Sequence, residues 1–326
     1  MERPFSICSL VCAAVALIVT ADGMAREQED FPARPIQVVV PATPGGPVDT
    51  GIRMIEARLA AALGVPLVLV NRPGASGIVG MNSVATAAAN GYTIAAGINS
   101  TFTVVHISGS TVPYSLDSFA LIGNYATDVS VLAVHPDAPW KTLQDLVEFA
   151  YKNPGKLTYG SAGVGTVSSL SMESVKHAFK LDITSVPFAG GAQMTVAILG
   201  KHVDIGMVPY STAAAMLQEK KLRPLLTTAA KRLLPLPDVP TLGEVGVPVK
   251  AFNLVLGLYA PKATPEAALN VLVNALAETM KDPAVEAKIE NIGLFAQYEN
   301  PAVARERLMN EYKDVLELDR QLPKAR

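Results

Sequence analysis

The chain has 326 residues, of which 50% are hydrophobic and 17% are charged. Its length is that of two ordinary domains, and the apolar content, together with a formal net charge of only −2, excludes a disordered chain. Because the charge is nearly balanced, the chain lacks the positive field that attracts a phosphate backbone, so we expect no nucleic-acid partner.

The first 25 residues predict an export signal. An apolar segment over residues 5–19 is followed by small residues that offer cleavage after Ala21 or after Ala25. This segment is shorter than the roughly 20 residues that a membrane-spanning helix needs. Both cysteines of the chain precede Ala21, so the mature protein would contain no disulfide. We expect a periplasmic protein from which a signal peptide, residues 1–25, is removed.

Short strands and helices then alternate along the chain. β-branched runs predict strands at residues 36–40, 67–70 and 93–96, and apolar residues at helical spacing predict helices at 49–63 and 74–89. This alternation is typical of βαβ units, so we expect α/β architecture with a mainly parallel sheet. Ligands of such sheets bind at the carboxyl ends of the strands.

The same alternation restarts near residue 130. The predicted strands lie at residues 130–134, 158–160, 183–187, 203–205 and 223–228, with helices at 166–179 and 192–199. A last strand at 254–260 precedes helices at 265–280 and 301–318. Two α/β groups and a helical tail predict two similar lobes, with the tail packed on one of them.

Four glycine-rich turns each follow a predicted strand and begin a predicted helix. They lie at residues 41–46, 71–77, 161–166 and 188–191. Such turns present backbone N–H groups at the positive end of a helix dipole, as an anion site requires. Any single turn is explained equally by the tight connection between strand and helix. Two turns in each lobe favour one shared site, for a carboxylate or a phosphate.

Signals for a nucleotide or a metal are weak. The chain contains no G-x-x-x-x-G-K-[ST] sequence, and the match of residues 163–168 to a dinucleotide fingerprint is incomplete. The four histidines, at positions 106, 135, 177 and 202, lack the i, i+4 spacing of a helical zinc site. We therefore expect neither cofactor nor metal.

Signals for catalysis are also weak. Ser76 and Ser161 lie in glycine-rich turns without the G-x-S-x-G surroundings of a nucleophile elbow, so we interpret them as hydrogen-bond donors and the protein as no enzyme. A secreted α/β hydrolase that uses one of these serines is the alternative. Asp49 is interpreted as a helix N-cap. Asp204 is either a turn cap or a group that faces the cleft.

The glycine-rich turns and their surroundings resemble the Bug receptor family, the substrate-binding proteins of tripartite tricarboxylate transporters. The similarity extends over nearly all of the mature chain. Among the matching segments are Pro44-Gly45-Gly46 with Asp49, Asn71-Arg72-Pro73-Gly74-Ala75, Val186-Pro187-Phe188, Val203-Asp204, Leu236-Pro237-Asp238-Val239-Pro240-Thr241 and Gly257-Leu258.

The resemblance implies a hinged, two-lobed periplasmic binding fold with a ligand carboxylate in the cleft between the lobes. Lobe one would comprise residues 31–128 plus 254–326, and lobe two residues 129–253. The closed protein would deliver its ligand to the membrane permease subunits of a tripartite tricarboxylate transporter. Presentation of the ligand to a sensor is the alternative output. A monomer is the default state of such receptors.

The resemblance also implies which residues bind the ligand. In lobe one they are Ala42, Thr43, Gly46, Ala75 and Ser76. In lobe two they are Ser161, Thr166, Val167, Ser168, Ala189, Gly190 and Asp204. Backbone N–H groups, hydroxyls and ordered water would hold one carboxylate, without an arginine. Arg72 matches a family position that we interpret as structural.

The sequence departs from the usual family pattern at four positions. Ala42 and Val255 stand where many relatives have aromatic residues, Val48 where a hydroxyl residue is common, and Ser169 where a histidine is common. These smaller, more apolar residues predict a roomier pocket. We therefore hypothesise an aromatic or extended carboxylate as the ligand, in preference to a small amino acid.

Overall fold

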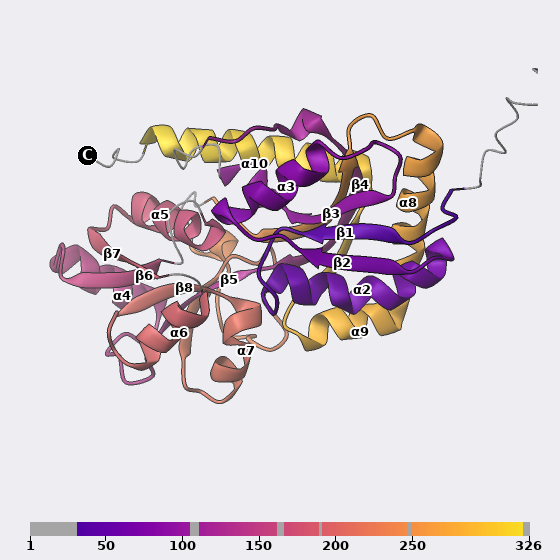
Figure 1. Cartoon of the computed structure of the whole chain (residues 1–326). Coiled ribbons are helices and arrows are strands. Elements are labelled where there is room, and N and C mark those ends of the chain that lie inside the picture. The colour runs from indigo at the N-terminus through magenta and orange to yellow at the C-terminus, as the bar shows by residue number, and fades with distance from the viewer. Residues whose placement is uncertain (1–30, 105–110, 162–165, 189–190, 247–249, 322–326) are drawn as a thin grey trace, which may run out of the picture.

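The protein is built around two separate β-sheets, each flanked by helices (Figure 1). The structure is a computed structural model that describes residues 31–104, 111–161, 166–188, 191–246 and 250–321. Within these described residues, a sheet of six strands and its helices form lobe one, and a sheet of five strands and its helices form lobe two. The predicted two-lobed α/β fold is therefore confirmed.

Lobe one is formed by two stretches of the chain. The first contains β1 (Ile36–Val40), α2 (Pro47–Leu63), β2 (Leu67–Asn71), η1 (Ala75–Gly77), α3 (Ile78–Ala85), β3 (Thr93–Ile98), η2 (Asn99–Thr101), η4 (Leu116–Ser118) and β4 (Phe119–Asp128). The second contains β10 (Leu254–Pro261), α8 (Glu266–Thr279), α9 (Pro283–Asn291), β11 (Phe295–Glu299) and α10 (Pro301–Gln321).

Lobe two is formed by the intervening stretch. Its elements are β5 (Ser130–Val134), α4 (Leu143–Lys152), β6 (Leu157–Ser161), α5 (Val167–Phe179), β7 (Ile183–Pro187), α6 (Gly191–Leu199), β8 (Ile205–Pro209), α7 (Tyr210–Gln218), β9 (Arg223–Thr227) and η5 (Leu242–Glu244).

Strand pairing is mixed in both sheets, which corrects the prediction of mainly parallel sheets. The strand orders are β11-β4-β10-β3-β1-β2 and β7-β6-β8-β5-β9. Pairs between β1 and its neighbours, and between β6 and its neighbours, are parallel, as expected for βαβ units. Pairs that involve β4, β5 or β10 are antiparallel, because these strands connect the lobes instead of continuing a βαβ unit.

Helices cover both faces of each sheet. In lobe one, α2, α8 and α9 bury a core against one face, while α3 and the first half of α10 bury a second core against the other. In lobe two, α4 and α5 cover one face, and α6 and α7 the other. Each fully buried aliphatic side chain contributes about 1.5–3 kcal/mol, so each lobe is stabilised by core burial without any disulfide among the described residues.

Two local predictions about helices differ in outcome. The predicted helix over residues 49–63 is right at its end but begins two residues earlier, because Pro47 occupies the first position of α2. It ends before Gly64, whose φ of 72° gives the left-handed C-cap expected of glycine. The predicted helix over residues 74–89 is wrong at both ends. Residues 74–77 have left-handed backbone, so α3 begins only at Ile78, and it ends at Ala85.

The chain passes between the lobes at β4–β5 and again between β9 and β10. Helix α10 also connects them, since it extends across lobe one and above α5 of lobe two (Figure 1). Its Leu308 belongs to a lobe-one core, whereas Val315 and Leu318 share a buried cluster with Val167 of α5. The expectation that the tail packs on a single lobe is therefore wrong. None of the helices in the described part of the chain has the length and apolar character to cross a bilayer.

Candidate functional site

The strand ends that carry the glycine-rich turns lie on the facing edges of the two lobes. In lobe one, β1, β2 and β3 are all parallel and end at this edge. In lobe two, β6, β7 and β8 are parallel and end at the opposite edge of the same interlobe region. Val104, just after β3, shares a buried cluster with Val167 at the start of α5, which places the two edges against each other (Figure 1).

The first turn leads into the N-terminus of α2. Gly46 is the N-cap of this helix and provides no side-chain cap, so the first N–H groups of α2 have no competing side chain there. Gly46 has an ordinary φ of −77°. The preceding Gly45 has a φ of 82°, a left-handed conformation that glycine adopts without strain. Thr43 is exposed and Ala42 is partly exposed.

Asp49 is not the N-cap that the sequence suggested. It lies three residues inside α2, is only 3% exposed, and its Oδ2 accepts the N–H of Gly45 at 2.9 Å. Arg53 donates to both carboxylate oxygens at 3.0 Å. The hydrogen bond from Arg53 is the main reason that the pKa of Asp49 is lowered to about 2. The carboxyl group is therefore ionised at any physiological pH.

The second turn has an unusual backbone. Gly74, Ala75, Ser76 and Gly77 have φ values of 133°, 46°, 53° and 93°. Left-handed conformations cost non-glycine residues on the order of 1–3 kcal/mol and concentrate at functional sites. Ala75 and Ser76 are both exposed. The turn therefore presents strained, accessible backbone directly before the N-terminus of α3.

Two glycines allow the lobe-one turns to pack closely together. A Cβ on Gly80 of α3 would lie 2.7 Å from both Arg72 O and the Cβ of Pro41. A Cβ on Gly77 would lie 3.0 Å from Cγ2 of Thr101. Absence of side chains at these positions lets the turns after β1, β2 and β3 pack against one helix. Arg72 contributes its backbone carbonyl to this packing, and the structural interpretation of its side chain stays a prediction.

The third lobe-one turn, after β3, was not predicted from the sequence. Asn99 is fully buried; its Nδ2 donates to Asn253 O at 2.8 Å, and its Oδ1 accepts the N–H of Val255 at 2.9 Å. It thereby ties the end of β3 to the second crossing between the lobes. The polar run 99–101 directly after a strand was the available signal.

Only some of the predicted ligand-binding residues of lobe two lie at the interlobe edge. Ser161 ends β6, is buried, and accepts the N–H of Phe188 on its backbone oxygen at 2.7 Å. Thr166 is the N-cap of α5 and its hydroxyl accepts the N–H of Ser169 at 3.3 Å. Ser168 is buried in the first turn of that helix. Val167 packs in the cluster with α10, which is a structural role. The predicted Ala189 and Gly190 lie outside the described residues.

Asp204 is not brought together with the other predicted residues. It precedes β8, whose first residue is Ile205, so it lies at the opposite end of the sheet from Ser161. Its Oδ2 accepts the N–H and the hydroxyl hydrogen of Thr158, at 2.8 and 2.9 Å. These bonds match the turn-cap alternative, in which the carboxylate joins the starts of β6 and β8.

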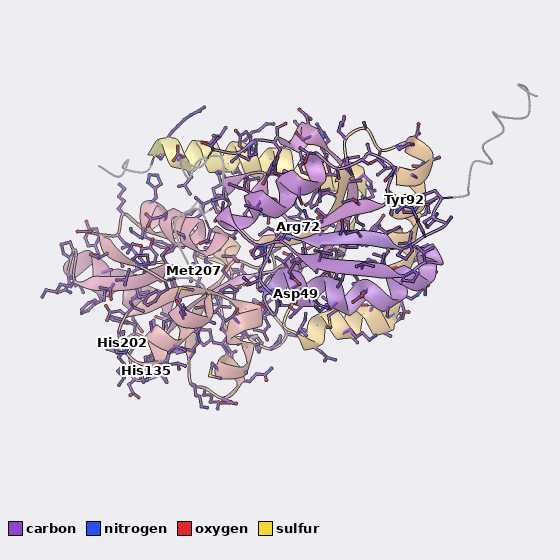
Figure 2. The ribbon with its side chains drawn as sticks, viewed as in Figure 1. Asp49, Arg72, Tyr92, His135, His202 and Met207 are labelled. Carbon is purple, nitrogen blue, oxygen red and sulfur yellow. The ribbon has the colours of Figure 1, made fainter. Side chains whose placement is uncertain are left out.

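His135 and His202 lie away from the serine-bearing turns. His135 directly follows β5, which begins at the interlobe edge and ends at the far one. Figure 2 shows His135 and His202 together on the far side of lobe two, with Asp49 and Arg72 near the interlobe edge of lobe one. Neither of these histidines is placed to activate Ser76 or Ser161. Within the described ranges, no three His, Cys, Asp or Glu side chains are grouped as a metal site.

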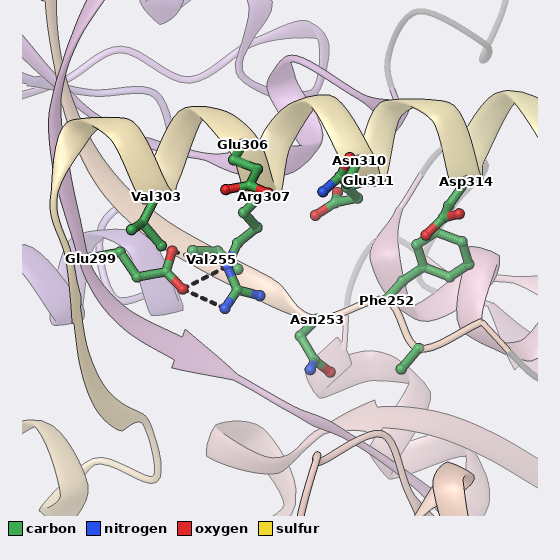
Figure 3. Close-up of a pocket in the computed structure, with 11 residues that line it drawn as sticks. Phe252, Asn253, Val255, Glu299, Val303, Glu306, Arg307, Asn310, Glu311 and Asp314 are labelled. Carbon is green, nitrogen blue, oxygen red and sulfur yellow. Dashed lines mark hydrogen bonds and ion pairs between the residues drawn. The ribbon is translucent and has the colours of Figure 1, made fainter.

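A pocket of about 380 Å³ lies elsewhere, between α10 and the second crossing (Figure 3). The described residues that line it include Glu299, Glu306, Glu311 and Asp314 but only one cation, Arg307, which is already paired with Glu299. Burial raises the pKa of Glu311. An anion would be repelled by this lining, so the pocket is a poor carboxylate site in spite of its size.

Two of the residues from which we predicted a roomy ligand pocket lie outside the interlobe site. Val255 lines it, and Val48 packs in the core of lobe one. Of the small residues from which we inferred a roomier ligand pocket, these two therefore do not enlarge the interlobe site. Ala42, in the first turn of lobe one, and Ser169, in the first turn of α5, are the residues that still support that inference.

Comparison with known proteins agrees with this geometry. Residues 52–314 match the model of the tripartite tricarboxylate transporter family receptor. The chain is 34% identical to a UPF0065 protein of Bordetella pertussis over 292 residues, which are 90% of either chain.

Solved structures share the fold, among them a periplasmic binding protein. R. palustris Rpa4515, solved with adipate, is 28% identical with a TM-score of 0.81, covering 90% of this chain and 98% of that one. MatC of Rhodopseudomonas palustris, solved with bound malate, is 28% identical with a TM-score of 0.77, covering 89% and 100%. The family consists of substrate-binding proteins, not enzymes. The chain belongs to the receptor family of the tripartite tricarboxylate transporters, the Bug receptors that its sequence resembles.

Proposed function

We propose that this protein is a periplasmic receptor that captures a small carboxylate between its lobes and delivers it to the permease of a tripartite tricarboxylate-type transporter. Family membership supports the receptor function. Two relatives of equal identity were solved with the dicarboxylates adipate and malate, which supports an organic acid as the ligand.

The observation that carries the proposal is the left-handed backbone at residues 74–77, beside the uncapped N-terminus of α2. Strain of this kind persists only when the surrounding structure enforces it, and here Gly77 and Gly80 pack the turn against its neighbours. Two helix N-termini at one edge suit a carboxylate, because charge-assisted N–H bonds are short and strong.

Closure of the lobes would complete the site. The open form would bind the carboxylate on the lobe-one turns, and closing would add Ser161, Thr166 and Ser168 from lobe two and exclude water. Water exclusion lowers the local dielectric constant, which strengthens each N–H to carboxylate bond. The two crossings, at Val129 and within residues 228–253, would act as the hinge.

The proposal includes the organisation of the mature chain. Residues 1–25 would be the removed signal peptide; they lie outside the described residues. Lobe one would comprise residues 31–128 plus 254–326, and lobe two residues 129–253, with a monomer as the working unit. The ligand would be an aromatic or extended organic acid. The small Ala42 in the first turn supports a roomy pocket, and the adipate complex of a relative supports an extended acid.

A thermal-shift screen tests the ligand class. The mature chain, unfolded and refolded to release any endogenous ligand, would be screened against aliphatic di- and tricarboxylates, aromatic acids and acidic amino acids. A ligand at 100 times its dissociation constant should add roughly 2.7 kcal/mol to the free energy of unfolding. No shift with any acid would contradict the proposal. Tight binding of small amino acids alone would contradict the extended ligand.

Gly46→Leu tests the place of binding. Among the described residues, a Cβ on Gly46 meets only Thr43 O, at 3.6 Å, and the φ is ordinary. The variant should therefore fold while its side chain blocks the N-terminus of α2. We expect at least a tenfold rise in dissociation constant. Gly243→Leu in lobe two is the matched control, because its Cβ would meet, within the described part of the chain, only Thr241 Oγ1 at 3.8 Å. Unchanged affinity in folded Gly46→Leu would place the ligand elsewhere.

Uptake tests delivery. A strain that lacks this chain should lose uptake of the identified acid and regain it with the wild-type gene. Normal uptake combined with loss of an acid-induced transcriptional response would indicate the sensor output instead.

A further inference from the structure

A hydrogen-bond network joins the first two turns of lobe one. Nδ2 of Asn71, the last residue of β2, donates to Ala42 O at 3.0 Å and to Asp49 Oδ1 at 2.9 Å. Asp49 Oδ2 accepts the N–H of Gly45 at 2.9 Å. Two side chains that are 22 residues apart therefore hold two backbone atoms of the turn at residues 41–46.

The bonds orient whole peptide groups, because each peptide unit is planar and trans. The carbonyl of Ala42 points toward Asn71, so the N–H of Thr43 in the same peptide unit points the opposite way. The N–H of Gly45 points toward Asp49, so the carbonyl of Pro44 points away from it. The network thereby sets the direction in which the exposed segment of this turn presents its donors.

The charge of the network is balanced. Asp49 is buried beside the N-terminus of α2, where a bound carboxylate would lie, and an unpaired anion there would repel the ligand. Arg53 donates to both oxygens of Asp49 at 3.0 Å and neutralises it. The carboxylate can therefore act as an acceptor for the turn without an electrostatic penalty for an anionic ligand.

We propose that Asp49 and Asn71 are positioning residues for the carboxylate-binding turn, acting on its peptide groups without touching the ligand. This inference rests on the proposed function. Every acid would bind its carboxylate group at this same turn. The two residues would therefore set the affinity for the carboxylate group and leave the preference among acids unchanged.

Asn71→Leu is the first test, because leucine keeps the size of the side chain and removes both donated bonds. Calorimetry with the refolded protein and two acids that bind the wild type should show dissociation constants at least tenfold higher, by the same factor for both acids. Asp145→Asn is the matched control in lobe two, where Asp145 also accepts backbone N–H groups, those of Lys141 and Thr142. It should lower the melting temperature without changing affinity.

Asn71→Asp tests the positioning role through the pH dependence of binding, which would not change if Asn71 only stabilised the fold. At pH 8 two ionised carboxylates would face each other at the 2.9 Å contact, and their repulsion should displace the turn and weaken binding. As the pH falls toward 5.5, one shared proton restores a donor between them. Affinity should then recover at least fivefold, whereas Asn71→Leu should show no recovery beyond that of wild type.

The outcomes separate this inference from the proposed function. A wild-type chain that binds no acid overturns both. Wild-type binding together with an Asn71→Leu dissociation constant within twofold of wild type overturns the positioning role alone. An Asn71→Asp variant that is folded at pH 8, by circular dichroism, and binds equally well at pH 8 and pH 5.5 also overturns it.

Discussion

At the scale of single residues, Asp128 joins the two lobes by hydrogen bonds, but its carboxyl group is buried, which disfavours the charged form. It is the last residue of β4, at the first crossing, and is 1% exposed. Its carboxylate accepts the N–H of Ser211 at 3.2 Å and the hydroxyl hydrogen of Ser211 at 2.5 Å, near the start of α7 in lobe two. Burial outweighs these bonds and raises the pKa of Asp128 to about 7.

The sign of the pH effect follows from linkage. Between about pH 4 and pH 7 the folded protein holds a proton on Asp128 that the unfolded chain has released, so this residue's contribution to stability falls as the pH rises through that range. Each pKa unit corresponds to about 1.4 kcal/mol.

We therefore expect Asp128→Asn to be more stable than wild type at pH 8, by a few kcal/mol at most, and closer to it at pH 4.5. Asparagine retains an oxygen for the N–H of Ser211 and removes the buried charge. Urea denaturation at both pH values measures the difference. Stability curves that run parallel for the two proteins would show that Asp128 does not titrate in this range.

At the scale of elements, the packing of α3 decides how the ligand turns are spaced. Replacing Gly80 with alanine should favour the helix by about 1 kcal/mol. The new Cβ, however, would lie 2.7 Å from Arg72 O and 2.8 Å from Cα of Pro41, neither of which is a flexible group. Overpacking costs typically 1–3 kcal/mol, so the clash should outweigh the gain in helix propensity.

We expect Gly80→Ala to lower the free energy of unfolding by roughly 1 kcal/mol and to weaken carboxylate binding, because both turns must move apart. Urea denaturation and calorimetry measure the two effects. Gly243→Ala is the control, because its Cβ would have one contact with the described residues, at 3.8 Å. A Gly80→Ala protein with wild-type affinity would show that the spacing of these turns is not critical.

At the scale of the whole molecule, α10 is a third connection between the lobes, beside the two crossings. Val315 shares its buried cluster with Val167 and Leu170 of α5, whereas Leu308 belongs to the core of lobe one. Lys250 Nζ adds an ion pair to Asp314 at 2.7 Å. Any movement of the lobes must therefore either carry the end of α10 along or break this cluster.

We expect Val315→Ala to destabilise the protein by about 2 kcal/mol, through lost burial and a residual cavity, and to accelerate amide exchange in α5. Leu308→Ala should destabilise at least as much but accelerate exchange in lobe one only. Hydrogen-exchange mass spectrometry of both variants distinguishes the patterns. Identical exchange of α5 in Val315→Ala and wild type would mean that α10 does not restrain lobe two.

Much of the fold could be predicted because its signals are local. Strand and helix patterns and the glycine that ends α2 depend on neighbouring residues only. The antiparallel strand β11 and helix α9 were missed, since their short polar stretches become regular structure only by packing on β4 and α2. The strain at Ala75 and Ser76 was missed for a related reason, because contacts around Gly77 and Gly80 enforce it.

The candidate site likewise has features that could be predicted from the sequence and features that could not. Glycine turns after parallel strands indicated the interlobe edge, and family motifs named candidate residues for it, because both depend on the order of residues along the chain. The sequence by itself thus determined the fold class, the family and the edge at which a ligand is expected. Only the tertiary structure decided that Asp204 joins the far strand ends, that Asn71 and Asp49 support the first turn, and that α10 contacts both lobes. These are contacts between residues distant in sequence, and neither composition nor periodicity records them.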